Sequence, residues 1–327
     1  MRFATALVTV QWEPELIAGL ERCLDAEKVI YARDDADITR ALETAEVAII
    51  ASDLDDRYVQ APKLRWVHCD HAGLNKSARP GVFERGLLVT SSSGRSSDAL
   101  AEHALFFMFN HAYRVREVIA AQSEHRWDNA GRQPLLALRG QTLGIIGVGK
   151  TGGALALRAR ALGMRVLGSR RSTEPVEGVD KMYSTERGDT IDELLRESDF
   201  IVLSTPLTDA THHLIGARQL GLMKPTAYLI NMARGSVIDE PSLIDALRSG
   251  TIAGAGLDVF EREPLQSDSP LWDMPNVLIT PHSTPALPDK QQRCYGVVCE
   301  NIRRLKAGEP LLNLLRRDEV WTKGAAI

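Results

Sequence analysis

Three side chains with complementary chemistry each follow an apolar, strand-like segment in the second half of the sequence: Arg234, Glu263 and His282. The guanidinium of an arginine is a planar fork that can bind a carboxylate through two hydrogen bonds. A histidine has a pKa near neutrality and can donate a proton, while a carboxylate on its second ring nitrogen fixes the tautomer and stabilises the protonated ring. Together the three groups could bind a 2-oxo acid and protonate its carbonyl oxygen as a hydride reaches the carbon.

Each of these residues also has an ordinary structural explanation. Arg234 could pair on the surface with Asp239 or Glu240. Glu263 lies in a charged loop, where solvated carboxylates are common, and a single histidine after a strand, such as His282, is usually a structural residue. We favour the chemical interpretation because the carboxyl ends of parallel strands meet at one edge of a sheet, where doubly wound proteins bind ligands.

A glycine motif indicates where a cofactor could bind at that edge. The segment 143–153, LGIIGVGKTGG, runs from an apolar strand into a turn and a helix, and Gly147, Gly149 and Gly152 give the spacing G-x-G-x-x-G. The first glycine allows a tight turn, the second lets a pyrophosphate approach the backbone, and the third lets the helix pack close to the strand. The helix N-terminus then presents unpaired N–H groups to the phosphates. Glycine turns also solve plain packing problems, but a second strand that ends roughly twenty residues later favours a dinucleotide site.

The end of that second strand indicates which dinucleotide would bind. An NAD site usually has Asp or Glu there to bind the ribose 2′-hydroxyl, whereas this chain has Ser169, Arg170 and Arg171. A serine removes the charge that would repel a 2′-phosphate, and the arginines can form charge-assisted hydrogen bonds to it. Two arginines after a strand could also be a solvated turn. The missing acid predicts NADP(H), with NAD as the weaker alternative.

The elements that must position these residues alternate between strands and helices, which predicts parallel sheets covered by helices on both faces. The first lobe has predicted strands at 3–10, 28–31, 47–51, 64–69 and 87–91, and helices at 15–24 and 37–42. An apolar segment at 99–114 predicts a long buried helix. The second lobe has a predicted helix at 154–162 after the glycine turn and strands at 164–169, 200–204, 227–232, 254–259 and 277–280.

A helical pattern at 296–308 can return to pack on the first lobe, which makes that lobe discontinuous. We therefore expect an α/β fold class with two doubly wound parallel-sheet lobes. Residues 1–100 and 288–327 would form a flavodoxin-like substrate domain, and residues 101–287 a Rossmann dinucleotide-binding domain. The predicted hinges lie near Leu100 and Leu287.

Composition limits the partners and the compartment. With 327 residues the chain can form two domains, and its formal net charge of −4 gives no reason to expect a nucleic acid or a membrane as partner. No apolar run reaches the length of a membrane-spanning helix, and the N-terminus lacks the pattern of a signal peptide. The four cysteines, Cys23, Cys69, Cys294 and Cys299, lack C-x-x-C spacing. They indicate neither a metal site nor a disulfide framework, so we expect a reducing, cytoplasmic setting.

The sequence resembles the D-isomer-specific 2-hydroxyacid dehydrogenase family over nearly its whole length. The matching stretches are LRGQTLGIIGVGKTGG, STPLTDATHHLI, MKPTAYLINMARGSVIDEPSLIDAL, AGLDVFEREPL and TPH. The resemblance implies a hydride exchanged between nicotinamide C4 and substrate C2, a two-lobed fold, and a homodimer built through the cofactor lobes. It implies that Arg234 anchors the substrate, Glu263 orients the histidine and His282 donates the proton.

Further site residues follow from the same resemblance. Asp258 would meet the nicotinamide carboxamide, and Ala72 and Gly73 would give backbone N–H groups to the substrate carboxylate. The expected cofactor-binding residues are Gly147, Gly149, Lys150, Thr151, Gly152, Ser169, Arg170, Arg171, Ser204, Thr205, Pro206, Leu207, Met232, Ala233 and Asp258. His71, Ala72, Gly73 and Arg234 are the expected substrate-binding residues.

Some segments depart from the pattern of the family. His71 stands where a small residue is usual near the substrate carboxylate, so it is either an added substrate contact or a hydrogen-bonding loop residue. Arg95, in the serine-rich loop SSSGRSSD, could face the substrate, but we expect it to be a surface residue. The segment after His282, STPALPDKQQR, also differs from the small-residue run that is common there. These differences from the family pattern are a reason to doubt that the usual small substrates of the family are the substrates of this protein.

The sequence therefore predicts an NADP(H)-preferring reductase of small 2-oxo acids, with glyoxylate or hydroxypyruvate as substrates implied by the resemblance. A formate dehydrogenase is disfavoured because that branch carries Gln where Glu263 stands. A phosphite dehydrogenase would share the Arg, Glu and His set. An alternative of another class is a cofactor-sensing binding protein on the same scaffold. Turnover of NADPH with 2-oxo acids distinguishes the enzyme from the binding protein.

Overall fold

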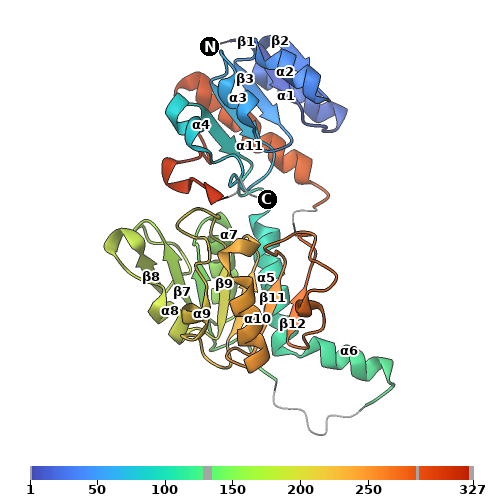
Figure 1. The fold of residues 1–327 in the computed structure, drawn as a ribbon, viewed down its shortest axis with the longest axis vertical. Coiled ribbons are helices and arrows are strands. Elements are labelled where there is room, and N and C mark those ends of the chain that lie inside the picture. Colours follow the sequence, from blue (N-terminus) through green and yellow to red (C-terminus); the bar gives the residue numbers. More distant parts are fainter. Residues whose placement is uncertain (1, 128–134, 285–286, 324–327) are drawn as a thin grey trace. The chain divides into compact units, whose positions relative to one another are not determined.

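The computed structural model of the protein describes residues 2–127, 135–284 and 287–323. The chain forms two compact units, one of Met1–Arg95 with Ala286–Ile327 and one of Ser96–Pro285 (Figure 1). The domain bounds predicted from the sequence place the first boundary at residue 100 and the second at 288. The helical segment expected to return to the first lobe belongs to the first unit.

The first unit is built on a five-stranded parallel sheet with the strand order β2-β1-β3-β4-β5. Its strands are β1 (Phe3–Val8), β2 (Ala26–Tyr31), β3 (Val47–Ile50), β4 (Trp66–Cys69) and β5 (Leu88–Ser91). Its helices are α1 (Pro14–Leu24), α2 (Asp35–Leu42), α3 (Asp56–Gln60), α4 (Pro80–Arg85) and α11 (Lys290–Ala307), with the 3₁₀ turn η4 (Arg317–Glu319). The short helices α3 and α4 were not predicted.

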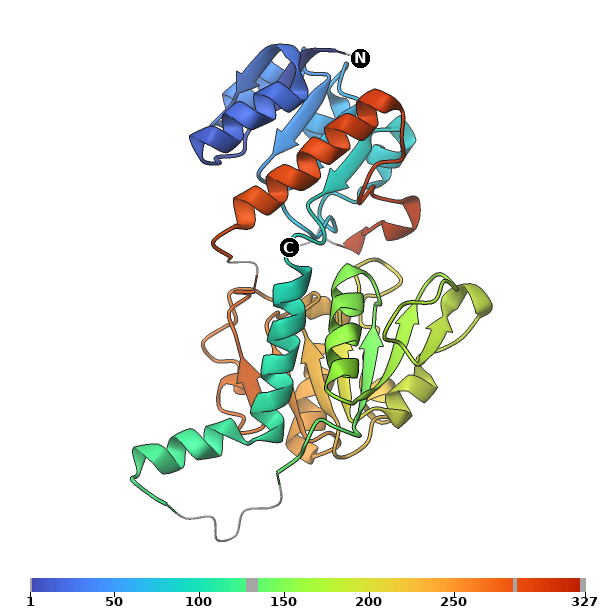
Figure 2. The ribbon, with the colours of Figure 1, turned by 180° about the vertical axis from the view of Figure 1, so that it is seen from behind.

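Successive residues of a strand point to opposite faces of the sheet, so strands that are apolar throughout make both faces apolar. Val47 and Ile49 pack in one core cluster with residues of α1 and α11. Ala48 and Ile50 pack in the opposite cluster with residues of α2 and α4. Figure 2 shows α11 lying beside α1 on one face of the sheet. The C-terminal helix therefore completes the core of the N-terminal unit.

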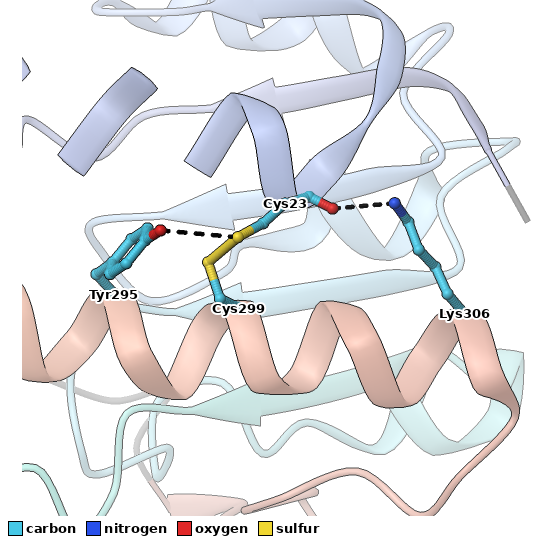
Figure 3. Close-up of a disulfide and its surroundings, with 4 residues drawn as sticks. All are labelled: Cys23, Tyr295, Cys299 and Lys306. Carbon is cyan, nitrogen blue, oxygen red and sulfur yellow. Dashed lines mark hydrogen bonds between the residues drawn. A yellow bond between two sulfur atoms is a disulfide. The ribbon is translucent and has the colours of Figure 1, made fainter. Parts of the chain in front are cut away.

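A disulfide joins the two helices on that face. Cys23 of α1 is bonded to Cys299 of α11, with the two Cα atoms 5.7 Å apart (Figure 3). Lys306 Nζ donates a hydrogen bond of 2.9 Å to the carbonyl oxygen of Cys23. The prediction that the cysteines form no disulfide was wrong, because residues 276 apart in sequence meet only through the packing of α11 on α1. Cys69 and Cys294 are buried and free.

We expect loss of this disulfide to destabilise the first unit. The bond restricts the unfolded chain between two distant residues, and such a constraint contributes about 2–4 kcal/mol. Cys299→Ser should therefore lower the melting temperature by roughly 5–15 °C in calorimetry. Reduction of the unaltered protein should give a similar decrease, and reduction of a Cys23→Ser/Cys299→Ser variant should give none. Equal melting temperatures before and after complete reduction would contradict the expectation.

The second unit is built on a seven-stranded parallel sheet with the order β12-β11-β10-β9-β6-β7-β8. Its strands are β6 (Thr142–Ile146), β7 (Arg165–Arg170), β8 (Lys181–Ser184), β9 (Phe200–Leu203), β10 (Tyr228–Asn231), β11 (Gly254–Leu257) and β12 (Val277–Ile279). Its helices are α5 (Ser97–Ala112), α6 (Val115–Ser123), α7 (Lys150–Ala161), α8 (Asp192–Glu197), α9 (Ala217–Leu220) and α10 (Glu240–Ser249), with the 3₁₀ turns η1 (Thr185–Arg187), η2 (Gly235–Val237) and η3 (Pro270–Trp272). The predicted fold of two doubly wound parallel sheets is confirmed.

The strand order reverses direction at β6, which lies between β7 and β9. In such sheets the loops after the two strands at the reversal separate, so ligands bind beyond their carboxyl ends. The turn after β6 carries the glycine motif, and the strands β9 to β12 end in the loops that carry the other predicted residues. Sheet topology therefore brings the predicted cofactor and catalytic residues of this unit to one edge.

The helix α5 differs from its prediction as a buried helix. Ala104, Phe107 and Met108 are buried in the core of the unit. Phe106 is 51% exposed, and Phe109 and Tyr113 are exposed as well. The chain is apolar on more than one side of this helix, so apolar composition did not reveal which side is covered. Among the described residues, no helix is long and apolar enough to cross a bilayer.

Candidate active site

The glycine turn after β6 has the geometry that each of its glycines was predicted to supply. Gly147 has a φ of +99°, and a Cβ there would lie 2.6 Å from the backbone nitrogen of Thr205. A Cβ on Gly152 would lie 2.6 Å from the carbonyl oxygen of Gly147. In contrast, a Cβ on Gly149 would meet nothing within 4 Å. The turn is therefore tight, closely packed on the helix, and open at the position where a pyrophosphate would approach.

The helix α7 begins directly after Gly149, so Lys150 and Thr151 form its first turn. This start lies four residues before the predicted start at Ala154. The unpaired N–H groups of a helix N-terminus and its positive dipole end favour an anion. The residues present thus fit a nicotinamide dinucleotide whose phosphates bind at the turn.

The predicted ribose-reading residues lie next to the same turn. The carbonyl oxygen of Ser169 accepts hydrogen bonds from the backbone nitrogens of Gly147 and Val148, at 2.8 and 2.9 Å. Ser169 is buried, and Arg170 ends β7. No carboxylate occupies the last position of the strand, in agreement with the sequence.

The loop after β10 holds Arg234 against the loop after β11. Asn231 Nδ2 donates to the carbonyl oxygen of Arg234 at 3.0 Å, and the backbone nitrogen of Ala233 donates to Asn231 Oδ1 at 3.0 Å. A Cβ on Gly235 would overlap the backbone of Phe260, so only glycine allows the two loops to approach this closely. Asn231 is a positioning residue that sequence reasoning missed. A polar residue at the carboxyl end of a buried strand is the signal that could have found it.

Glu263 and His282 form the hydrogen-bonded pair that the sequence predicted. His282 Nδ1 lies 2.8 Å from Glu263 Oε2. The other carboxylate oxygen of Glu263 accepts a hydrogen bond of 3.0 Å from the backbone nitrogen of Phe260, which fixes its orientation. Since Nδ1 is bound to Glu263, Nε2 is the ring nitrogen left for a substrate, and it has no hydrogen-bond partner within the described part of the chain.

The electrostatics of the three groups are coupled. The hydrogen bond that His282 donates to Glu263 raises the pKa of His282 above its usual value, while burial and the charge of Arg234 oppose the rise. Burial raises the pKa of Glu263, but the hydrogen bonds from His282 and Phe260, with the charges of His282 and Arg234, lower it overall. The arrangement therefore favours an imidazolium beside a carboxylate, which is the state that can donate a proton.

A network of buried polar residues holds the backbone of His282. This histidine has a φ of +50°, a left-handed conformation that only tertiary contacts can maintain in a residue with a side chain. Its backbone nitrogen donates to the carbonyl oxygen of Asp258 at 2.9 Å. Asp258 is 1% exposed, and its carboxylate accepts hydrogen bonds from Thr280 Oγ1 at 2.6 Å and Thr284 Oγ1 at 2.9 Å. His103 of α5 is hydrogen-bonded to Thr284.

These contacts give Asp258 a positioning function that the sequence did not predict. Its carboxylate binds the segment 280–284, which carries His282, so its expected contact with a nicotinamide carboxamide stays a prediction. Thr280, Thr284 and His103 were missed as supports because Asp258 and His103 lie far in sequence from the segment 280–284.

A second histidine, His213, connects the loop that follows Arg234 to the loop that carries Glu263. His213 Nε2 lies 2.7 Å from Glu261 Oε1, and His213 Nδ1 lies 3.7 Å from Asp239. The ligand atoms of these three residues lie within 4.8 Å of one another, a spacing at which a cation could bind. Asp239, one possible surface partner of Arg234 in the sequence, thus pairs with His213. The sequence spacing of the three residues gave no sign of this cluster.

The remaining cofactor residues lie at the ends of β9 and β10. Ser204 Oγ donates a hydrogen bond of 2.6 Å to the carbonyl oxygen of Gly147, which ties the loop Ser204 to Leu207 to the glycine turn. Met232 and Ala233, which connect the end of β10 to Arg234 in the sequence, are both buried. The expected substrate residues His71, Ala72 and Gly73 lie in the first unit, after β4. Arg95 also lies there, and the prediction that it is a surface residue was wrong, because it is buried.

This fold and this site define a dinucleotide-dependent oxidoreductase, and known proteins agree. The sequence profile of the D-isomer specific 2-hydroxyacid dehydrogenase NAD-binding domain matches residues 105–284. A glyoxylate reductase from Korarchaeum cryptofilum is 37% identical over 285 residues, which cover 84% of this chain and 83% of that protein. The chain belongs to the D-isomer-specific 2-hydroxyacid dehydrogenase family.

Two solved structures are similar over almost their whole length. A D-isomer-specific 2-hydroxyacid dehydrogenase from Xanthobacter autotrophicus Py2, in complex with NADPH and MES, has a TM-score of 0.82 and 32% identity, covering 97% of this chain and 99% of that one. An NADPH-dependent glyoxylate/hydroxypyruvate reductase from Sinorhizobium meliloti has a TM-score of 0.80 and 28% identity, covering 97% and 99%. The predicted family, enzyme class and use of a nicotinamide dinucleotide are confirmed.

Proposed function

We propose that the protein reduces small 2-oxo acids of the glyoxylate or hydroxypyruvate type to D-2-hydroxy acids with NADPH. The observation that carries the proposal is the 2.8 Å contact between His282 and Glu263, within electrostatic reach of Arg234. Glyoxylate is the substrate in the name of the Korarchaeum relative, and the Sinorhizobium neighbour is named for glyoxylate and hydroxypyruvate.

Each residue has a definite function in the proposed reaction. The reduced nicotinamide supplies the hydride when it is bound. Arg234 binds the substrate carboxylate and orients the carbonyl, with backbone N–H groups of Ala72 and Gly73 as further donors. His282 Nε2 donates a proton to the carbonyl oxygen, and Glu263 stabilises the charged ring and fixes its tautomer.

NADP(H) is the proposed cofactor in preference to NAD(H). Ser169 in place of an acid, followed by Arg170 and Arg171, supports it, since charge-assisted hydrogen bonds to a 2′-phosphate contribute about 1.5–3 kcal/mol each. Proposed contacts to the rest of the cofactor come from Gly147 to Gly152, Ser204 to Leu207, Met232, Ala233 and Asp258.

A substrate panel measured with NADPH and NADH in parallel tests the proposal. We expect turnover of glyoxylate and hydroxypyruvate, with kcat/KM at least about tenfold higher for NADPH. Oxidation of phosphite or formate without 2-oxo acid turnover would favour the related dehydrogenases. NADPH binding without turnover of any substrate would favour a cofactor-sensing binding protein.

The rate of reduction should depend on pH through His282. This residue must be protonated before the proton transfer, and the folded protein raises its pKa. The rate should therefore be high below that pKa and fall as pH rises through it. Glu263→Gln removes the main cause of the raised pKa, so it should move the inflection to lower pH. A flat profile for the unaltered enzyme through about pH 9 would contradict a proton-donor function.

We also propose a homodimer built through the second unit. Exposed apolar residues support it: Phe106 and Phe109 of α5, Tyr113 directly after α5, and Val118 and Ile119 of α6, of which Ile119 is 57% exposed.

A cytoplasmic location stays a prediction. The redox state of Cys23 and Cys299 in protein taken from that compartment would test it, since disulfides are rare there.

A further inference from the structure

Arg95 is a buried arginine whose side chain has no partner in the described part of the protein. The residue is 7% exposed, and its Nε is enclosed without a hydrogen-bond acceptor. It forms no ion pair with a described carboxylate. Burying a guanidinium is costly unless its donors are bound, so this position needs an explanation.

Other arginines of the same unit show what a structural arginine looks like here. Arg85 Nη1 donates to the carbonyl oxygen of Tyr58 at 3.2 Å, and Arg85 Nη2 donates to that of Leu64 at 2.8 Å. Arg57 forms ion pairs with Asp55 and Asp35 at 2.6 and 2.9 Å. Arg95 is more deeply buried than either but has no such acceptor. No described residue accepts from its side chain, so its donors are available to a bound group.

The loop of Arg95 is bound to the predicted substrate loop. β4 and β5 are paired, with Cys69 opposite Ser91, so the loops after them leave the same edge of the sheet. The backbone nitrogen of Ser92 donates to the carbonyl oxygens of Cys69 and His71, at 3.2 and 3.0 Å. The backbone nitrogen of Arg95 donates to Ser92 at 3.2 Å. Arg95 thus belongs to the same cluster as His71, Ala72 and Gly73.

Buried polar side chains fix this loop from below. His68 is fully buried and lies 3.0 Å from Ser92 Oγ. Burial lowers the pKa of His68 to about 3, so the ring is neutral and serves as a hydrogen-bonding support. Asn313 Nδ2 donates to the carbonyl oxygens of Ser91 and Ser93, each at 2.8 Å. The loop that carries Arg95 is therefore held in place by contacts among three segments: β4, the loop after β5 and the C-terminal segment.

Two residues near Arg95 also have enclosed atoms without a hydrogen-bond partner, Nε2 of His71 and Oδ1 of Asp70. His71 Nε2 lies 3.7 Å from Asp53 Oδ1, which is within ion-pair distance but too far for a hydrogen bond. Asp70 and Arg95 both act electrostatically on Cys294, so they lie in the same region, yet they form no ion pair. Trp12 Nε1 holds the other oxygen of Asp70 at 3.1 Å. The carboxylate offsets part of the cost of the buried cation and leaves the donors of the guanidinium unbound.

We propose that Arg95 and His71 form a subsite for a second acidic group of the substrate, a carboxylate or a phosphate. A guanidinium presents up to five N–H donors in one plane, which suits such a group, and His71 adds one more polar atom. This inference rests on the proposed function, in which Ala72 and Gly73 bind the carboxylate next to the reacting carbonyl. The substrate is then a 2-oxo acid with a second anionic group, larger than glyoxylate.

Kinetics with NADPH and four 2-oxo acids test this inference on the full-length enzyme. Glyoxylate and hydroxypyruvate have one acidic group, 2-oxoglutarate has a second carboxylate, and 3-phosphohydroxypyruvate has a phosphate. We expect kcat/KM for one of the last two to exceed that for glyoxylate by at least about 30-fold, since hydrogen bonds to a charged group contribute about 1.5–3 kcal/mol each. The preferred one identifies the acidic group. A parent enzyme that prefers glyoxylate to both overturns the inference.

Variants then assign the preference to Arg95. Arg95→Gln should lower the ratio of kcat/KM between the preferred diacid and glyoxylate by at least about 30-fold, and Arg95→Lys should lower it less. Arg79→Gln is the matched control, because Arg79 is a partly exposed arginine of the same unit paired with Asp56, and it should keep the ratio. An unchanged ratio in a folded Arg95→Gln protein also overturns the inference. If Arg95→Gln does not fold, the inference is tested by the same kcat/KM ratio in Arg95→Lys and by the substrate preference of the unaltered enzyme.

A binding measurement separates this inference from the proposed function. Titration calorimetry of the NADPH-bound protein with succinate and with D-3-phosphoglycerate needs no turnover. Binding of one anion that Arg95→Gln abolishes supports the subsite even if no 2-oxo acid is reduced. Reduction of glyoxylate with no binding of either anion leaves the proposed function intact and overturns the subsite.

Discussion

Replacing His282 by alanine is expected to lower kcat for 2-oxo acid reduction by about 10²–10⁴-fold, the usual contribution of a general acid, with a much smaller change in KM. His282 Nδ1 is bound to Glu263 at 2.8 Å, so Nε2 is the atom that can reach the substrate. The loss concerns the transition state, in which the oxygen gains charge as hydride reaches the carbon. Steady-state kinetics at saturating NADPH measure both constants.

Two controls make the His282 result specific. His125→Asn changes an exposed histidine of the same unit, also at a positive φ, and should leave kcat unchanged. NADPH binding, followed by nucleotide fluorescence, should persist in His282→Ala. Unchanged turnover in His282→Ala would refute the proton-donor function. A loss of nucleotide binding would instead indicate that the segment 280–284 had collapsed.

Much of the site could be predicted because its signals are local. The glycine spacing after β6 determines a turn whose geometry depends on only a few neighbouring residues. Arg234, Glu263 and His282 could be placed together because parallel strands end at one edge of a sheet. Strand and helix patterns with periods of 2 and 3.6 residues identified most elements of both lobes. The bounds of several predicted elements shifted, as where α7 begins at Lys150 rather than Ala154.

The features that were missed depend on contacts between distant segments. The disulfide between Cys23 and Cys299 needs the packing of α11 on α1, which no cysteine spacing shows. The network around His282 joins α5 to the loops after β11 and β12. β8 has four residues and begins with a lysine, so its pattern is too short to recognise.

Predicting burial from composition failed in opposite directions for Arg95 and for α5. The serine-rich surroundings of Arg95 suggest a solvated loop, yet packing between β4, β5 and the C-terminal segment buries it. The apolar segment of α5 suggests full burial, yet Phe106 is half exposed. Composition gives the average polarity of a segment, while burial of each side depends on what packs there.

Replacing Arg234 by alanine is the second change with a large expected effect. Arg234 should bind the substrate carboxylate both before and during the reaction and should orient the carbonyl, so KM should rise and kcat should fall. Loss of two charge-assisted hydrogen bonds corresponds to a decrease in kcat/KM of about 10²–10⁴-fold. Arg234→Lys should recover part of it, because lysine keeps the charge without the planar fork. Arg248→Ala, an exposed arginine of α10, is the matched control.

The pH profile distinguishes an anchor beside His282 from a residue that merely supports the loop. The charge of Arg234 lowers the pKa of His282, whereas the hydrogen bond that His282 donates to Glu263 raises it. Arg234→Ala should therefore move the inflection of the reduction rate to higher pH, and Glu263→Gln should move it to lower pH. A loop-supporting arginine would reduce activity without this upward shift. Because the two substitutions act on one imidazole in opposite directions, a shift of the same sign in both would contradict the proposed arrangement.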